Sequence, residues 1–127
     1  MLTDEADRVE ELVRRHTNGE LRAIGIYRPG GTEFTFLREE LQSAYTEQRG
    51  RLGTLVSMLA EVGARLYDQS SIESPLGRYR GSIHCSEDAY ALHYHLSEDS
   101  GIVVTLDRDT DLDVTDLSYR CESLLYD

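Results

Sequence analysis

The sequence predicts a single α+β domain, in which a five-stranded antiparallel sheet lies between a middle helix and two terminal helices. Two observations indicate this fold. Apolar residues recur at helical spacing near both ends and in the middle of the chain. Short segments with the composition and alternation of strands lie between those helices, two before the middle helix and three after it. The length of 127 residues suits one core, so residues 1–127 are treated as one domain.

The first element is an amphipathic helix near the N-terminus. Thr3 can cap it, and Asn18-Gly19 is a typical helix end. Its apolar residues share one face: Ala6, Val9, Leu12 and Val13.

A β-hairpin is predicted next. Residues 20–28 and 32–37 have strand character, and Pro29-Gly30-Gly31 between them is turn chemistry. We expect Phe34 and Phe36 on one face of this hairpin. The small residues opposite them would leave room for the rings: Ala23 and Gly25.

From Arg38 the apolar pattern changes to a helical period. Residues 38–45 predict a short helical segment, and Gly50 is expected to separate it from a longer helix that ends near Tyr67. Residues 69–77 form a polar linker. The apolar stripe of the longer helix, which we expect to be buried, consists of Leu52, Leu55, Val56, Leu59, Val62 and Leu66.

The last third of the chain predicts three strands and a closing helix. The strands are residues 78–85, 89–96 and 101–106, and the helix is residues 110–126. GIVVTL, the third of these strands, is apolar on both faces, which is typical of a central strand covered on both sides. The closing helix has one apolar stripe: Val114, Leu117, Cys121, Leu124 and Leu125.

The segment SIHCSEDAYALHYHL, residues 82–96, holds three of the four histidines. If Ser86–Ala89 is a four-residue hairpin loop, Cys85 faces Tyr90 and the two strand faces are fixed. One face then pairs Ile83 with Leu92 and Gly81 with Tyr94, beside Tyr79 and Leu96. The other face pairs His84 with Ala91, Ser82 with His93, and Arg80 with His95.

Three imidazoles on one sheet face allow two interpretations. His93 and His95 lie roughly 6.5–7 Å apart along one strand, with His84 diagonal to them, so the set could bind zinc or copper. Against this, Arg80 adds positive charge, and the face has no carboxylate. We therefore favour a semi-polar sheet face, partly under the middle helix or at a dimer seam, with a pH-responsive contact as a further alternative. No metal, cofactor or catalytic constellation is predicted.

The charge of the chain excludes some partners. Asp and Glu total 24, all 13 basic residues are Arg, and the net charge is -11, which disfavours nucleic acid and anionic membranes. Acidity without lysine is typical of proteins from extreme halophiles. There is no membrane-spanning apolar run, and the charged N-terminus is not a signal peptide, so we expect a cytoplasmic protein in which Cys85 and Cys121 are reduced, buried thiols.

The predicted element order, α-ββ-α-βββ-α, resembles the profilin-like architecture and, within it, the roadblock family of small dimerising scaffold domains. The tail SEDAYALHYHLSEDSGIVVTLDRDTDLDVTDLSYRCESLL carries much of the likeness. The same stretch, with FLREEL, also resembles a family of small acidic haloarchaeal proteins, and this second resemblance implies no activity. The roadblock resemblance implies the sheet order 2-1-5-4-3 and a GTPase-like partner. It also implies a dimer seam at Tyr79, Gly81, Ile83, Arg51, Ser57 and Arg65.

These observations predict a non-enzymatic, cytoplasmic protein-interaction or scaffold domain that works as a homodimer with an unidentified protein partner. The alternative is a metal- or ligand-binding sensor that uses His84, His93 and His95.

Overall fold

The computed structural model describes residues 2–43, 45–70, 74–109 and 111–126, with the side chains of residues 43–51 outside that description. The predicted order of helices and strands is confirmed, with one short helix preceding the long middle helix. The elements are α1 (Leu2–His16), β1 (Leu21–Arg28), β2 (Gly31–Leu37), α2 (Glu39–Ser43), α3 (Tyr45–Gln69), β3 (Gly81–Cys85), β4 (Ala89–Ser97), β5 (Ser100–Asp107) and α4 (Val114–Tyr126).

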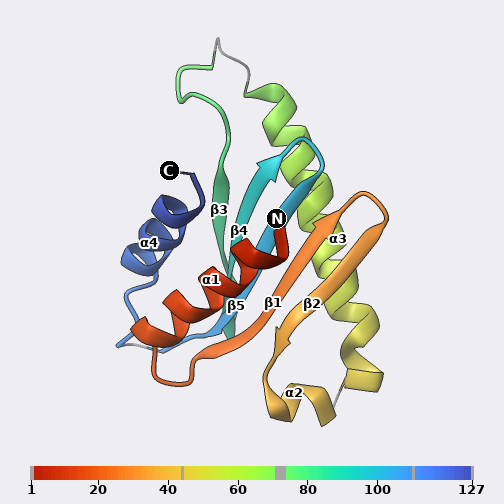
Figure 1. The fold of residues 1–127 in the computed structure, drawn as a ribbon, viewed down its shortest axis with the longest axis vertical. Helices are drawn as coiled ribbons and strands as arrows, with labels where there is room; N and C mark the ends of the chain where they lie inside the picture. Colours follow the sequence, from red (N-terminus) through yellow and green to blue (C-terminus); the bar gives the residue numbers. More distant parts are fainter. Residues whose placement is uncertain (1, 44, 71–73, 110, 127) are drawn as a thin grey trace.

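The strands form one antiparallel sheet in the order β2-β1-β5-β4-β3, as predicted. Helices α1 and α4 cover one face of this sheet, and α3 crosses the other (Figure 1). The central strand β5 buries residues on both faces, which explains its continuous apolar run. The two edges of the sheet are β2 and β3.

The main core lies between the sheet and the two terminal helices. Alternate residues of β1, β4 and β5 point to this face and meet the apolar stripes of α1 and α4. Its buried members are Ala6, Val9, Val13, Leu21, Ile24, Ile26, Leu92, Tyr94, Ile102, Val104, Leu106, Leu117 and Cys121.

The face under α3 has a smaller apolar cluster. It consists of Tyr27, Val56, Leu59 and Val103, with Phe34, Ala60 and Ala91 packed against it. Polar residues complete this layer, because His93 and His95 are also fully buried there.

The prediction that Phe34 and Phe36 share one face is wrong. The β1–β2 register pairs Phe36 with Ile24 and Phe34 with Gly25, and the bulge between them accommodates Thr35 as an extra residue. Phe34 therefore packs under α3, and Phe36 packs against the main core. The expected role of Gly25 is confirmed, since a Cβ there would lie 3.2 Å from Phe34 Cε1 and 3.0 Å from Val56 Cγ2.

Two expectations for the middle helix also need correction. Gly50 lies within α3, because the short helix already ends at Ser43 and α3 begins at Tyr45. The predicted buried stripe is divided: Val56 and Leu59 are buried, but three of its other members have exposed fractions of 36–45%, namely Leu55, Val62 and Leu66. The helix contacts the sheet along a neighbouring line that continues to Gly63, a residue with no apolar signal.

Candidate functional site

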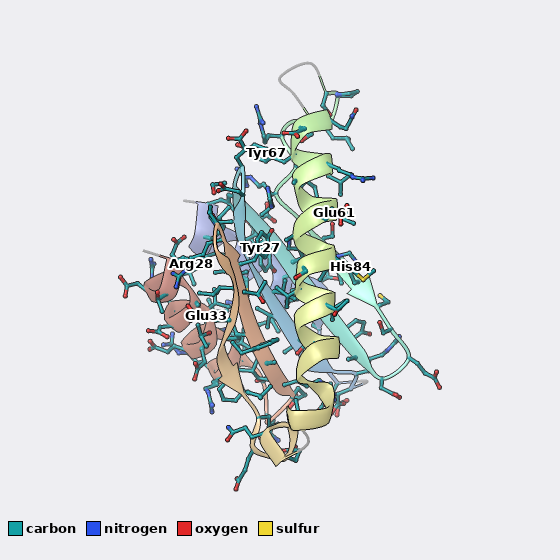
Figure 2. All side chains as sticks on the ribbon, turned by 90° about the vertical axis from the view of Figure 1, so that its right-hand side faces the viewer. Tyr27, Arg28, Glu33, Glu61, Tyr67 and His84 are labelled. Carbon is teal, nitrogen blue, oxygen red and sulfur yellow. The ribbon has the colours of Figure 1, made fainter. Side chains whose placement is uncertain are left out.

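The β3–β4 hairpin places the histidines as predicted. Its register pairs His84 with Ala91 and Ser82 with His93, and the pairing of Cys85 with Tyr90 is also confirmed. His84, His93 and His95 therefore all project from the face that α3 covers. Figure 2 shows α3 in front of this face, with His84 on the β3 side of the helix.

The two residues before β3 exchange faces relative to the prediction. Arg80 was expected beside His95, but its guanidinium forms an ion pair with Glu122 of α4 at 3.1 Å on the opposite face. Tyr79 was expected on that opposite face, but its hydroxyl lies 3.3 Å from His93 Nδ1. The reason is that regular β3 pairing begins only at Gly81, so strict alternation does not extend to these residues.

A chain of polar side chains runs through the layer beneath α3. The Tyr27 hydroxyl lies 2.6 Å from His93 Nε2 and 2.6 Å from His95 Nδ1. Beyond His93, Tyr79 Oη lies 2.7 Å from Ser82 Oγ on the edge strand. Beyond His95, its Nε2 lies 3.2 Å from the Glu98 carbonyl in the β4–β5 turn. We call this set, from Ser82 to the Glu98 carbonyl, the buried polar chain.

Neutral imidazoles give the buried polar chain one consistent direction. The Glu98 carbonyl can only accept, so His95 Nε2 donates to it, and His95 Nδ1 accepts from the Tyr27 hydroxyl. The Tyr27 oxygen then accepts from His93 Nε2–H, and His93 Nδ1 accepts from Tyr79. Finally, Ser82 donates to the Tyr79 oxygen. Every hydrogen is used once, so each buried group in the chain has a partner.

Burial keeps these imidazoles neutral. Desolvation lowers the pKa of His93 to about 4, assisted by repulsion from His95 and His84. Desolvation also lowers the pKa of His95, although Asp68 and Asp99 act in the opposite direction. Burial raises the pKa of the Tyr27 hydroxyl, so that it remains a donor. The directions of these pKa shifts agree with the directions of the hydrogen bonds.

Gly63 allows α3 to lie directly on the two buried histidines. A Cβ at this position would be 2.7 Å from His93 Cε1 and 2.9 Å from His95 Nδ1, closer than real contacts of this kind. Tyr67, one turn later on the same helix, covers His95 with ring centroids 5.3 Å apart. Tyr27 and Gly63 are the site residues that the sequence analysis missed, and Tyr79 is one that it assigned to the other face of the sheet.

The three histidine side chains, as the structure places them, do not converge on one point where a metal ion could be held. Ring nitrogens of His93 and His95 are already bound to Tyr27, and the ring of His84 lies 6.3 Å from that of His93. Nε2 of His84 is buried and has no hydrogen-bond partner among the described residues. Within the described ranges, no group of three or more His, Cys, Asp and Glu is placed to hold a metal ion.

Among the residues that the structure describes, no strand pairs with the outer side of the edge strand β3. The residues that flank β3 on either side form backbone hydrogen bonds with the β4 side of the hairpin. The His95 N–H donates to the Arg80 carbonyl at 2.8 Å, and the Ser86 N–H donates to the Ala89 carbonyl at 2.9 Å. Antiparallel pairing alternates, so the odd-numbered residues point their N–H and C=O groups away from β4. These residues are Gly81, Ile83 and Cys85.

An exposed apolar stripe on α3 runs beside this edge. Leu55, Met58, Val62 and Leu66 follow helical spacing and have exposed fractions of 36%, 58%, 45% and 41%. We call these four residues the outer stripe of α3. Leu66 lines a pocket of about 630 Å³ together with Tyr79, Gly81 and Ile83, so this end of the outer stripe lies on the β3 side of the helix.

The residues that the sequence analysis assigned to a dimer seam are distributed around these two features. Ile83 is 39% exposed at the free edge. Ser57 and Arg65 are exposed on α3 but lie outside the outer stripe, and Arg65 forms an ion pair with Glu61. The side chain of Arg51 lies outside the described part of the chain.

The two cysteines are free thiols in different environments. Cys121 is buried in the main core as expected, but the expectation that Cys85 is buried is wrong, because it lies exposed at the end of the edge strand β3. Burial raises the pKa of the Cys121 thiol to about 11, so it is a poor nucleophile.

Comparison with solved structures identifies the class of fold. The crystal structure of a Roadblock/LC7 domain from Streptomyces avermitilis matches with a TM-score of 0.59 and 16% identity, over 94% of this chain and 90% of that one. The crystal structure of MglC from Myxococcus xanthus matches with a TM-score of 0.58 and 18% identity, over 95% and 93% of the two chains. The chain therefore has a roadblock-like fold.

Residues 7–126 match the model of the family described as Domain of unknown function (DUF7522), and the chain belongs to that family. No curated protein matches the sequence. None of the described helices is long and apolar enough to cross a membrane.

Proposed function

We propose that the chain is a non-enzymatic protein-interaction domain that works as a homodimer in the cytoplasm. The observation that carries this proposal is the free edge of β3 beside the outer stripe of α3. An unpaired edge strand is a template for another strand, and exposed apolar residues at helical spacing favour a second helix. A copy of the same chain offers both features at once.

The buried polar chain supports a structural role for the histidines. His93 and His95 have exposed fractions of 0% and 1%, so a substrate has no access to their ring nitrogens. Each nitrogen is also occupied by a hydrogen bond in the direction derived above. These side chains hold β1, β3 and β4 in register beneath α3, which supports a scaffold and not a catalyst.

A GTPase-like partner is the further part of this proposal, and it rests on the roadblock-like fold. Roadblock dimers commonly serve as platforms for small GTPases, and a dimer of this chain would present an enlarged surface of the same kind. The net charge of -11 favours a protein partner over a nucleic acid or an anionic membrane.

The oligomeric state tests the proposal directly. We expect light scattering behind a sizing column, at about 2 M KCl so that carboxylate repulsion is screened, to give twice the monomer mass of 14.4 kDa. Met58→Glu and Val62→Glu place a charge in the outer stripe and should each shift the peak to the monomer. Ser57→Glu adds the same charge on α3 outside the stripe and should leave the dimer intact.

Two results would contradict the proposal. A wild-type monomer at all protein concentrations would remove the homodimer. If Ser57→Glu dissociates the dimer and the two stripe variants do not, the interface lies on a different surface. Circular dichroism of each variant checks that its fold is retained.

A further inference from the structure

We infer that β3 pairs with β3 of a second copy in the register that places Ile83 on the twofold axis, so that His84 of the second copy caps the buried polar chain. This inference rests on the homodimer proposed above. It adds the register of the seam and a residue that each copy contributes to the site of the other.

The free backbone groups select this register. Two antiparallel copies of β3 centred on Ile83 pair Ile83 with itself and Gly81 with Cys85, so every outward N–H and C=O of β3 finds a partner. A slip toward the N-terminus would recruit Tyr79, whose N–H already donates to Ser70 Oγ at 2.6 Å. A slip toward the C-terminus would recruit Glu87, which lies in the turn after β3.

The charges that flank β3 favour the same arrangement. Arg78 and Arg80 precede the strand, and Glu87 and Asp88 follow it; all four are exposed. An antiparallel pair of copies brings the basic flank of one β3 beside the acidic flank of the other. A parallel pairing would instead bring like charges together.

The register also determines what meets across the seam on the α3 face. Ser82 and His84 both point to this face, and Ser82 of one copy lies directly opposite His84 of the other. Ser82 donates to Tyr79 and keeps a free acceptor, which the single N–H of a neutral His84 can fill. Desolvation lowers the pKa of His84, which favours the neutral ring. The hydrogen bonds of each buried polar chain then continue across the dimer seam in the same donor-to-acceptor direction.

A cysteine scan along β3 measures the register. In a Cys85→Ser background we would introduce Ser82→Cys, Ile83→Cys or His84→Cys, oxidise the folded protein with copper phenanthroline, and score covalent dimer on a non-reducing gel. A twofold axis joins identical positions, and the Cα separation of about 5.5 Å in such a pair suits a disulfide. We expect Ile83→Cys to crosslink at least tenfold faster than the other two or wild-type Cys85.

The double variant Ser82→Cys/His84→Cys gives a second readout. These positions face each other in the proposed register, so the pair should crosslink although each single change does not. It also keeps the register testable in case Ile83→Cys does not fold, which light scattering under reducing conditions would reveal. Fastest crosslinking at position 82, 84 or 85 would show another register and overturn the inference.

The results separate this inference from the proposed function. A monomer under reducing conditions, for wild type as well as variants, would remove both. A wild-type dimer in which neither Ile83→Cys nor the double variant crosslinks would leave the homodimer and remove the β3 seam.

The role of His84 has its own measurement. In reduced protein, His84→Ala should raise the dimer dissociation constant about tenfold, because a hydrogen bond is lost at each of two symmetric positions. Ser57→Ala is the matched control on the exposed side of α3. An unchanged dissociation constant in His84→Ala would show that His84 does not cap the chain.

Discussion

Mostly aliphatic side chains fill the face of the sheet under α1 and α4, where the buried Tyr94 hydroxyl bonds to Ser118 at its rim. The face under α3 instead buries two histidines and a tyrosine hydroxyl, hydrogen-bonded to one another, among a few apolar residues. The first face is stabilised by removal of apolar surface from water, which depends weakly on direction. The second depends on hydrogen bonds that must each find their partner, since an unpaired buried polar group is costly.

This difference indicates a division of roles between the two faces. The main core tolerates apolar replacements of similar volume, because total volume and pattern matter more than exact shape. The layer under α3 fixes one relative position of β1, β3, β4 and α3, because its hydrogen bonds link all three strands and Gly63 fits over them. The surface proposed as the dimer seam lies on this hydrogen-bonded layer.

Tyr27→Phe should lower the free energy of unfolding more than any of the other changes below. It keeps the ring but removes the hydroxyl that joins the two histidines, leaving His93 Nε2–H and His95 Nδ1 without a partner. Each orphaned buried group costs roughly 1–3 kcal/mol of unfolding free energy. Chemical denaturation at fixed pH and salt measures this loss.

The matched control is Tyr119→Phe. Tyr119 is 67% exposed on α4, so its hydroxyl is hydrated and its removal should change stability by less than about 0.5 kcal/mol. Equal effects of the two substitutions would show that the buried polar chain contributes no specific stability.

Acid should destabilise the layer under α3. The folded-state pKa of His93 is lowered to about 4 from an unfolded value of 6.5, so the folded state binds fewer protons than the unfolded one. Its contribution is fully present above pH 6.5 and is lost as the pH falls toward about 4. We expect a loss of about 2 kcal/mol between about pH 7.5 and about pH 5 from His93 alone.

The buried histidines and Asp107 take up protons in different pH ranges, so their effects on stability can be separated. Arg38 and Arg22 lower the pKa of Asp107, at the end of β5, so its contribution is lost only at more acidic pH. Denaturation curves at the two pH values, at constant high salt, give the difference. Equal stability at both would show that the buried histidines do not resist protonation.

The pattern of the sequence was sufficient for the fold and for the histidine face. The β3–β4 register followed from the assumption that Ser86–Ala89 forms the hairpin loop, and the observed pairs agree with it. A slip of one residue would have turned Leu92 and Tyr94 toward α3. The helix was harder, since the apolar positions of α3 serve two surfaces. Helical periodicity shows that apolar residues share a side of the helix. It does not distinguish a face buried against the sheet from a face exposed to solvent.

The site residues that the sequence analysis missed or misplaced lacked a local signal for their position. Tyr27 lies about 66 residues before His93 in the sequence, and nothing short-range connects them. Tyr79 lies just before regular β3 pairing begins, so extending the alternation placed it on the wrong face. Gly63 acts through the absence of a side chain. Close approach of a helix to buried rings is a tertiary property, and it becomes visible only when the elements are packed.

Two glycines of α3 offer the most local test of the layer. Gly53→Ala meets nothing within 4 Å and should stabilise the protein by about 0.5–1 kcal/mol through helix propensity. Gly63→Ala gains the same propensity but drives a methyl group into His93 and His95, whose rings are held by Tyr27, so it should destabilise by roughly 1–3 kcal/mol. Thermal or chemical unfolding of both variants gives the contrast. If both substitutions stabilise the protein, α3 can move away from the sheet at no cost. The close fit of Gly63 over His93 and His95 would then not fix the position of the helix.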